Sequence, residues 1–290
     1  MESTAVLRRF NRTYTQRIGV LEESFLGTGR PLAVNRVLFE VGADEGTTVR
    51  RLREHLGLDS GHLSRLLRRL EGDRLVSIGP DPVDARRRVV HLTADGRAAV
   101  EDLDRRSEDL AVELLSPLTE RQRTRLSEAL ATADLLVRAA TVELRTVPPD
   151  DAVAREATRR YVAELAARFP AGFEPDGPEA AEPGATYVVA TSGGAPVAHG
   201  GIRPLPDLPG RTAELKRMWV DAEWRGAGLG ARMLRHLEAL AQQTGHDRVV
   251  LDTNATLTEA IDLYERMGYR RTERYNDNPY ADHFFERTLP

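Results

Sequence analysis

The spacing of apolar residues changes near residue 140, and this change constrains the fold more than any other feature. Before it, apolar side chains such as Leu7, Phe10 and Tyr14 recur every three or four residues, which predicts amphipathic helices. After it, short apolar runs alternate with glycine turns and helical segments. We therefore expect an α+β chain of two domains, mostly helical over 1–141 and a mixed sheet with flanking helices over 142–290.

Composition excludes several classes of function. The chain has no Cys, which excludes disulfide scaffolds, thiolate zinc sites, Fe–S clusters and a cysteine acyl-enzyme. The seven His show no metal-ligand spacing, so we assign no metal. No apolar run reaches the length of about 18 residues that a membrane span needs, and the N-terminus lacks the apolar core of a secretory signal. A cytoplasmic protein without a membrane segment is expected.

A helix, a glycine turn and a second helix are predicted between residues 47 and 73. Thr47 is the candidate N-cap of the first helix, and the second helix starts near Asp59. Four leucines define the buried face of the second helix, so that Ser64, Arg65 and Arg68 face outward. A reader of the DNA major groove needs such a helix. An ordinary helical hairpin with a solvated Arg face explains the spacing equally well.

A hairpin and two long helices are predicted to follow. The segment LVSIGPDPVDARRRVVHLT alternates around a Pro/Gly/Asp turn, which predicts a β-hairpin with Arg86, Arg87 and Arg88 at its tip. The stretch 50–88 holds ten Arg against six acidic residues, and Arg suits planar contacts to phosphate and guanine. Heptad spacing in the two long helices indicates a helical dimer interface.

The run VRRLREHLGLDSGHLSRLLRRLEGDRLV and the D-x-R hairpin Asp84-Ala85-Arg86 resemble the winged helix-turn-helix of MarR-family transcription regulators. The resemblance implies a homodimer formed through the helices of residues 1–26 and 95–140 and bound to a pseudo-palindromic DNA operator. The acidic loop Asp44-Glu45 departs from this pattern, because it would repel phosphate if it faced DNA. The residues that the resemblance assigns to the groove and the wing are Ser60, His62, Ser64, Arg65, Arg68, Asp84, Arg86 and Arg88.

A strand from Leu215 to Val220 leads into Arg225-Gly226-Ala227-Gly228-Leu229-Gly230 and then a helix. Glycines at this place let backbone N–H groups approach an anion at the helix N-terminus, and Arg225 adds positive charge. The loop is neither a Walker loop, because no Gly-Lys-Ser/Thr follows, nor the dinucleotide fingerprint, because the spacing is G-x-G-x-G. Taken alone, the loop is better explained by a tight strand-to-helix turn.

In context, this loop resembles motif A (Q/R-x-x-G-x-G/A) of the GNAT superfamily of acyl-CoA-dependent N-acyltransferases, and VVLDTN with EAIDLYERMGYRR resembles motif B. The resemblance implies acetyl-CoA as the acyl donor. The implied cofactor-binding residues are Met218, Trp219, Val220, Arg225, Gly226, Ala227, Gly228, Leu229, Gly230, Asn254 and Tyr264. Of these, Asn254 is expected to hydrogen-bond near the thioester, and Tyr264 is expected to protonate the leaving thiolate.

The attacking amine must be neutral, so a base or a water chain is needed. Glu214 is the best candidate for a catalytic base, with His199 second, although a solvent-facing role for Glu214 is an equal alternative. The C-terminal segment is expected to complete the acceptor side through a last strand, 282–288. Its candidate substrate contacts are Tyr275, Asn276, Asn278 and Tyr280, although an ordinary loop explains this segment at least as well.

The combined interpretation is a sequence-specific DNA-binding regulator fused to an N-acetyltransferase that acts on a small-molecule or protein amine. In one alternative, the second domain only senses acyl-CoA or an amine without turnover. In another alternative, the winged helix serves only for dimerisation. The presence of Arg65, Arg68 and Arg86 disfavours this alternative. The sequence leaves open the acceptor, the operator and the sign of regulation.

Overall fold

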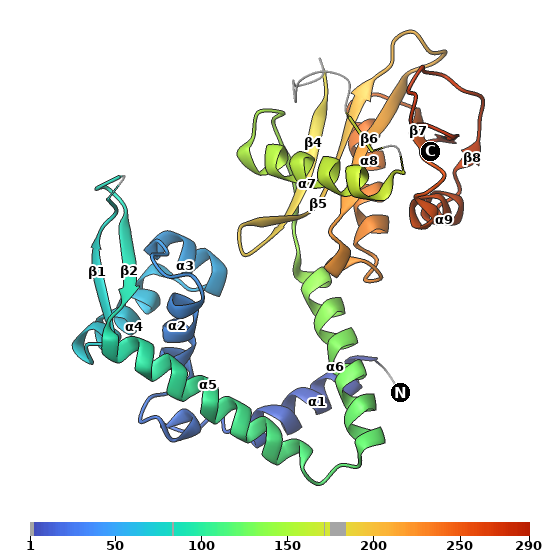
Figure 1. The fold of residues 1–290 in the computed structure, drawn as a ribbon. Helices are drawn as coiled ribbons and strands as arrows, with labels where there is room; N and C mark the ends of the chain where they lie inside the picture. Colours follow the sequence, from blue (N-terminus) through green and yellow to red (C-terminus); the bar gives the residue numbers. More distant parts are fainter. Residues whose placement is uncertain (1–2, 83, 171, 175–183) are drawn as a thin grey trace. The chain divides into compact units, whose positions relative to one another are not determined.

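The computed structural model describes residues 3–82, 84–170, 172–174 and 184–290 (Figure 1). The chain divides into two compact units, Met1–Ser127 and Glu128–Pro290. The sequence-based boundary lies between 141 and 142, whereas the structure divides the chain within helix α6 (Glu120–Thr141). The reason is local packing, because Ala139 and Val142 belong to the apolar core of the second unit. Within the described residues, no helix is both long and apolar enough to cross a membrane.

The first unit is mainly helical. Its core joins α2, α3 and α4 to a two-stranded antiparallel hairpin. The elements are α1 (Ser3–Arg17), the 3-10 helix η1 (Phe25–Gly27), α2 (Leu32–Ala43), α3 (Val49–Leu56), α4 (Ser60–Gly72), β1 (Val76–Pro80), β2 (Arg88–Leu92), α5 (Ala94–Leu115) and the start of α6.

Side-chain caps define the helix-turn-helix. Thr48 accepts a hydrogen bond from the backbone N–H of Arg51 at 3.1 Å, and Asp59 accepts one from His62 at 2.8 Å. The predicted cap at Thr47 is wrong by one residue, because Thr47 is buried and its carbonyl pairs with Val90 of the hairpin.

The first helix is shorter than the sequence pattern predicts. It ends at Arg17, because Gly19 takes a left-handed φ of 66° and turns the chain. A single helix over residues 1–26 is therefore wrong. The apolar side chains Leu7, Phe10 and Tyr14 are exposed in this single chain, at 60%, 45% and 46%.

The second unit is a seven-stranded sheet with helices on both faces. Its strand order is β3-β4-β5-β6-β7-β9-β8, antiparallel except for the parallel pair β6 and β7. Its elements are β3 (Leu144–Val147), α7 (Ala152–Arg168), β4 (Thr186–Ser192), β5 (Ala195–Pro204), β6 (Thr212–Val220), the 3-10 helix η2 (Ala222–Trp224), α8 (Leu229–Gln243), β7 (Arg248–Thr253), α9 (Thr258–Arg266), β8 (Arg270–Arg271) and β9 (His283–Thr288).

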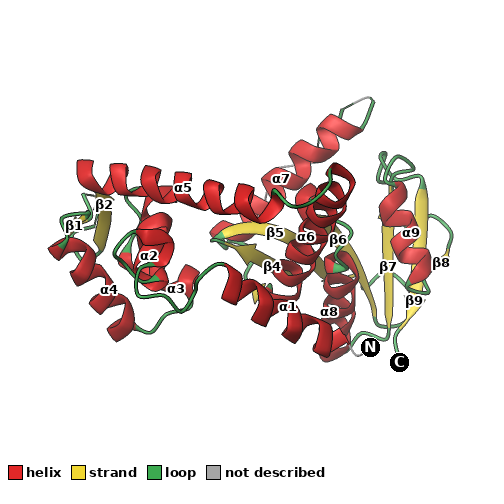
Figure 2. Cartoon of the chain, turned by 90° about the horizontal axis from the view of Figure 1, so that it is seen from below, coloured by secondary structure: helices red, strands yellow, loops and turns green. Residues whose placement is uncertain are grey.

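Neighbouring residues of β5 show which helix covers which face. His199 lies 3.4 Å from Thr158 of α7, whereas a Cβ atom on Gly200 would lie 2.8 Å from Leu237 of α8. Successive residues of a strand point to opposite faces, so α7 and α8 cover opposite faces. Strands β4 and β5 form a hairpin that turns at Gly193 and Gly194. The predicted last strand is confirmed as β9, which lies beside β7 (Figure 2).

Strands β6 and β7 separate along their length. They pair only over Thr212–Glu214 and Arg248–Val250, although β6 continues to Val220 and β7 to Thr253. Opposite β5, the register shifts around Gly200, and Arg217 of β6 takes a positive φ of 52°, which marks a β-bulge. No strand of the described residues therefore pairs with β6 at Met218 and Val220 on the side that faces β7.

Candidate functional site

The candidate DNA-binding residues of the first unit lie on one helix and one hairpin. On α4, Ser60, Ser64, Arg65 and Arg68 are exposed, and His62 is partly buried. The Ser64 hydroxyl donates to the Ser60 carbonyl at 2.7 Å, and Arg68 Nε donates to the Ser64 carbonyl at 3.2 Å. These contacts lie along a single outward helix face.

At the hairpin tip, Asp84 contacts two of the three arginines. Asp84 accepts from the backbone N–H of Arg86 at 3.1 Å, while its ion pair is with Arg87 at 3.2 Å. The side chains of Arg86 and Arg88 are exposed. In the acidic loop, Asp44 pairs with Arg51 and Glu45 with Arg97, at 3.3 and 2.9 Å. These ion pairs reduce the repulsion that the loop would exert on phosphate.

The glycines of the loop before α8 have different physical tasks. Gly226 and Gly228 take φ of 82° and 77°, conformations that favour glycine. Gly228 is the N-cap of α8 and supplies no side-chain hydrogen bond, so the first N–H groups of the helix are available to an anion. Gly230 instead packs closely, since a Cβ there would lie 3.3 Å from Leu263 of α9.

A cavity of about 460 Å³ adjoins this loop and the open edge of β6. Met218, Trp219 and Val220 line it from β6, and Tyr161 and Glu164 line it from α7. Further lining residues are Leu165, Arg168, Trp224, Arg225, Gly226, Gly228, Leu229, Gly230, Ala231, Leu257, Glu259, Ala260, Leu263, Tyr264, Arg266 and Met267.

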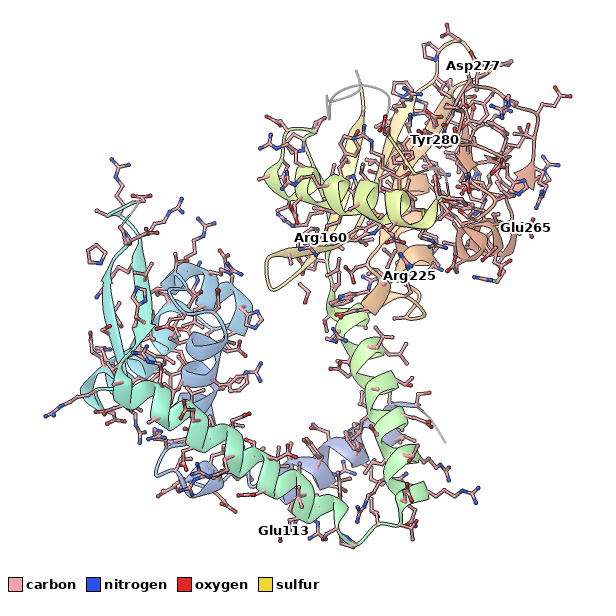
Figure 3. All side chains as sticks on the ribbon, in the orientation of Figure 1. Glu113, Arg160, Arg225, Glu265, Asp277 and Tyr280 are labelled. Atoms are coloured by element: carbon pink, nitrogen blue, oxygen red, sulfur yellow. The ribbon has the colours of Figure 1, made fainter. Side chains whose placement is uncertain are left out.

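Arg225 does not point freely into solvent. Its Nε donates to the Val220 carbonyl at 3.0 Å, and its guanidinium pairs with Glu164 of α7. Glu164 also accepts hydrogen bonds from Trp219 Nε1 at 2.9 Å and from Arg168 at 3.3 Å. Burial opposes ionisation of Glu164, but the hydrogen bonds from Arg225 and Trp219 outweigh it and lower the pKa of the carboxyl group. Figure 3 labels Arg225 in this unit.

Tyr264 is 6% exposed and lines the cavity. Burial raises the pKa of its phenol above the usual value, and Tyr161 and Asp252 add to the effect. The phenol therefore keeps its proton at neutral pH.

The side chain of Asn254 makes hydrogen bonds within the protein. Its Nδ2 donates to the Tyr280 carbonyl at 2.8 Å, and its Oδ1 accepts from the backbone N–H of Thr256 at 2.9 Å. Asn254 clamps a loop here, and its contact with the donor stays a prediction.

Glu214 is 1% exposed, so a solvent-facing position for it is wrong. Arg203 Nε lies 2.5 Å from its carboxylate and Lys216 Nζ 3.7 Å. Tyr275 and Asn276 of the C-terminal segment donate to it at 3.0 and 3.2 Å. This carboxylate is held by two cations and two neutral donors, and it does not line the cavity.

His199 is fully buried beneath α7 and does not line the cavity. Burial lowers its pKa to about 4, and the charge of Arg217 contributes. The ring stacks on Tyr187 with the centroids 5.2 Å apart. His199 is therefore a neutral core residue, and its position under α7 gives no support to a role as base.

Two family models match the chain. Residues 28–87 match the MarR family, and residues 151–269 match the Acetyltransferase (GNAT) family. Each match covers less than half of the chain, and the two matched ranges are called the MarR region (28–87) and the GNAT region (151–269) below, after the models that they match. The first match includes the residues from Ser60 to Arg86, and the second includes the loop from Arg225 to Gly230 and Tyr264.

Individual proteins resemble parts of the chain. It is 36% identical over 94 residues to the probable N-acetyltransferase family 8 member 5 of Mus musculus, over 32% of this chain and 41% of that protein. The chain spans about half the length, or less, of the curated relatives that it matches first. The crystal structure of a putative acyl-CoA N-acyltransferase from Klebsiella pneumoniae shares 26% identity, over 52% of this chain and 99% of that one, with a TM-score of 0.41. A MarR-family regulator from Rhodococcus sp. RHA1 shares 20%, over 46% and 94%, with a TM-score of 0.38.

Within the GNAT region, sequence reasoning missed Glu164, Arg168 and Asp252. Glu164 and Arg168 are an ordinary i, i+4 pair on a helix, a pattern that signals nothing about a distant loop. Asp252 carried a weak signal, because it is a single carboxylate in the otherwise apolar strand VVLDT. Its partners Asn276 and Asn278 were predicted as substrate contacts, and the structure instead joins them to this carboxylate, at 2.6 and 3.2 Å.

Proposed function

We propose that the GNAT region transfers an acetyl group from acetyl-CoA to the amine of a small molecule or protein, and that the MarR region binds a pseudo-palindromic DNA operator as a homodimer. One observation carries the first part. A single cavity adjoins the open edge of β6, the glycine loop at the start of α8 and the protonated phenol of Tyr264.

The lining residues fit an acyl-CoA. Beyond the last pair with β7, no strand of the described residues pairs with β6 at Met218 and Val220 on the side away from β5, and this edge suits the amides of a pantetheine arm. The Val220 carbonyl already accepts from Arg225. The N–H groups at the start of α8 suit a pyrophosphate. Arg225, steadied by Glu164, holds the loop between them through its bond to the Val220 carbonyl.

Acetyl-CoA would supply an acetyl group activated as a thioester. The chain's contribution would be to hold a proton at the Tyr264 hydroxyl until the thiolate leaves, since the raised pKa keeps that proton bound at neutral pH. The apolar lining, which includes Leu229, Leu263 and Met267, would exclude water from the reacting carbonyl.

The test is the release of CoA, followed with a thiol reagent, in the presence of acetyl-CoA and a panel of amines. Because the chain has no Cys, it adds no thiol background. Tyr264→Phe should lower kcat by about 10²–10⁴-fold, the usual contribution of a positioned acid, with the Kd of acetyl-CoA unchanged. Tyr14→Phe, at an exposed tyrosine of α1, is the matched control. A Tyr264→Phe enzyme with wild-type kcat would remove Tyr264 from the mechanism.

A second candidate function is an acyl-CoA sensor without turnover. It is favoured by Glu214, because the predicted base is already held by Arg203 and Lys216. Binding of acetyl-CoA with no CoA release on any amine would support it. In that case, acetyl-CoA should change the affinity for DNA, and DNA should change the affinity for acetyl-CoA by the same factor.

A further inference from the structure

Two carboxylates of the GNAT region share one hydrogen-bond network but have different partners. Asn276 Nδ2 lies 3.2 Å from Glu214 and 2.6 Å from Asp252. Glu214 has two cations, Arg203 and Lys216, within 4 Å. Asp252 receives only the neutral amides of Asn276 and Asn278, both at Oδ2, and no cation from the described part of the chain forms an ion pair with it.

Asp252 lies where β6 and β7 separate. The last parallel pair joins Glu214 to Val250, and Asp252 follows Val250 by two residues on the same face of the sheet. The side chain is only partly buried. Its charge contributes to the raised pKa of both Tyr161 and Tyr264, and both tyrosines line the cavity. Asp252 is not itself a lining residue, but its carboxylate lies within electrostatic range of two tyrosines that are.

An aromatic cluster, Tyr161, Phe169, Phe173 and Tyr280, adjoins this carboxylate. The ring centroids of Phe173 and Tyr280 are 4.8 Å apart, and Phe169 lies 5.7 and 6.1 Å from them. Tyr161 reaches Phe173 at 6.3 Å. The Asn278 side chain, which donates to Asp252, also accepts from the backbone N–H of Tyr280 at 3.1 Å. Figure 3 labels Tyr280 on the segment that carries these asparagines.

A partly buried carboxylate that has only neutral donors favours a cation from outside the chain. Aromatic faces attract both cations and flat apolar groups. The two carboxylates that line the cavity already have cations, because Glu164 pairs with Arg225 and Arg168, and Glu259 pairs with Arg168. Among the carboxylates in and next to this cavity, Asp252 is therefore the one whose negative charge a bound ammonium group would neutralise.

We propose that Asp252 binds the ammonium group of the acceptor, and that the aromatic cluster binds an aromatic substituent on the same molecule. The inference rests on the proposed function and adds a substrate class to it, the arylalkylamines. Asn276 and Asn278 act as positioning residues, which orient the carboxylate through Oδ2 and leave Oδ1 to the acceptor.

The experiment is calorimetric titration of the full-length protein, saturated with CoA, with three probes: phenethylamine, butylamine and 3-phenylpropionate. Phenethylamine should bind at least about tenfold more tightly than butylamine, because only the former reaches the aromatic cluster. The phenylpropionate keeps the ring but reverses the charge, and it should bind at least about 100-fold more weakly than phenethylamine. This comparison needs no variant and so does not depend on how a variant folds.

Variants then locate the effect. Asp252→Asn should weaken the binding of both amines by about 30-fold or more, as expected when one partner of a charged hydrogen bond is lost. Asp247→Asn, at the other end of the β7 region and paired with Arg211 at 3.1 Å, is the matched control and should change nothing. Phe173→Leu should reduce the preference for phenethylamine over butylamine to below about threefold.

The outcomes separate this inference from the proposed function. If amines bind in an Asp252-dependent way but no CoA is released, acetyl transfer fails and the amine site stands. If CoA is released but Asp252→Asn binds amines like the wild type, transfer stands and this site is wrong. Failure of the wild-type protein to bind either amine, or equal binding of 3-phenylpropionate, overturns the inference.

Discussion

The MarR region and the GNAT region present their candidate residues in opposite ways. In the first, Ser64, Arg65 and Arg68 are exposed on one helix, and their contacts span four residues. In the second, Glu214 and Tyr264 are buried, and two of the partners of Glu214, Tyr275 and Asn276, come from 61 and 62 residues away. Exposed residues that are close in sequence act by presenting charge to a partner. Buried residues that folding brings together from distant parts of the chain act through their orientation and through shifted pKa values. Substitutions in the first region should therefore affect binding alone, and those in the second should also affect pKa or stability.

The largest expected effect tests the exposed set. Arg65→Ala combined with Arg68→Ala should weaken specific operator binding by about 10³-fold, since each arginine contact with guanine contributes about 1–3 kcal/mol. Gel shifts with the operator should show this loss, while the Kd of acetyl-CoA and the thermal midpoint stay unchanged.

Arg36→Ala is the matched control for that variant, because Arg36 lies on α2 and pairs with Glu40 of the same helix at 2.5 Å. Operator binding by the double variant at wild-type strength would show that α4 does not read the groove.

A smaller effect tests the buried set through pH. His199 has a pKa lowered to about 4 in the folded chain, against about 6.5 when unfolded. Below pH 6.5 the unfolded state binds the extra proton, so this group should remove up to about 3 kcal/mol of stability as the pH falls from 6.5 to 4. Urea unfolding at pH 7 and pH 4.5 measures it.

Substitution of His199 measures how much of the loss of stability at low pH comes from this residue. His199→Gln should remove this part of the acid destabilisation, whereas His246→Gln, in a more accessible turn, should leave it in place. An identical pH dependence in the wild type and His199→Gln would contradict a buried neutral histidine.

The smallest predicted effect tests whether acetyl-CoA binding depends on the backbone conformation of the loop before α8. Gly228→Ala, at φ 77°, should strain the loop by about 1 kcal/mol and weaken acetyl-CoA binding by about fivefold. Gly245→Ala, at φ 89° after the other end of α8, imposes similar strain away from the loop. It should lower the thermal midpoint without changing the Kd of acetyl-CoA. Equal affinities in the two variants would show that the loop conformation does not matter for binding.

Much of the fold could be predicted because its determinants are close in sequence. Asp59 caps α4, Gly57 ends α3 in a left-handed conformation, and the glycines before α8 set a strand-to-helix loop. Each of these depends on residues within a few positions of one another. Where a local pattern failed, a single residue was responsible, as when Gly19 ended α1 at Arg17.

By itself, the sequence therefore determined the two fold classes, the outward residues of α4, the loop from Arg225 to Gly230 and the strand and helix that flank it. The tertiary structure alone decided the electrostatics of the GNAT region. It placed Glu164 against Arg225, buried Glu214 between Arg203 and the C-terminal segment, and gave Asp252 only neutral partners. The physical reason is that periodicity shows which face of an element is buried, whereas the charge state of a buried group depends on neighbours that folding brings from far along the chain.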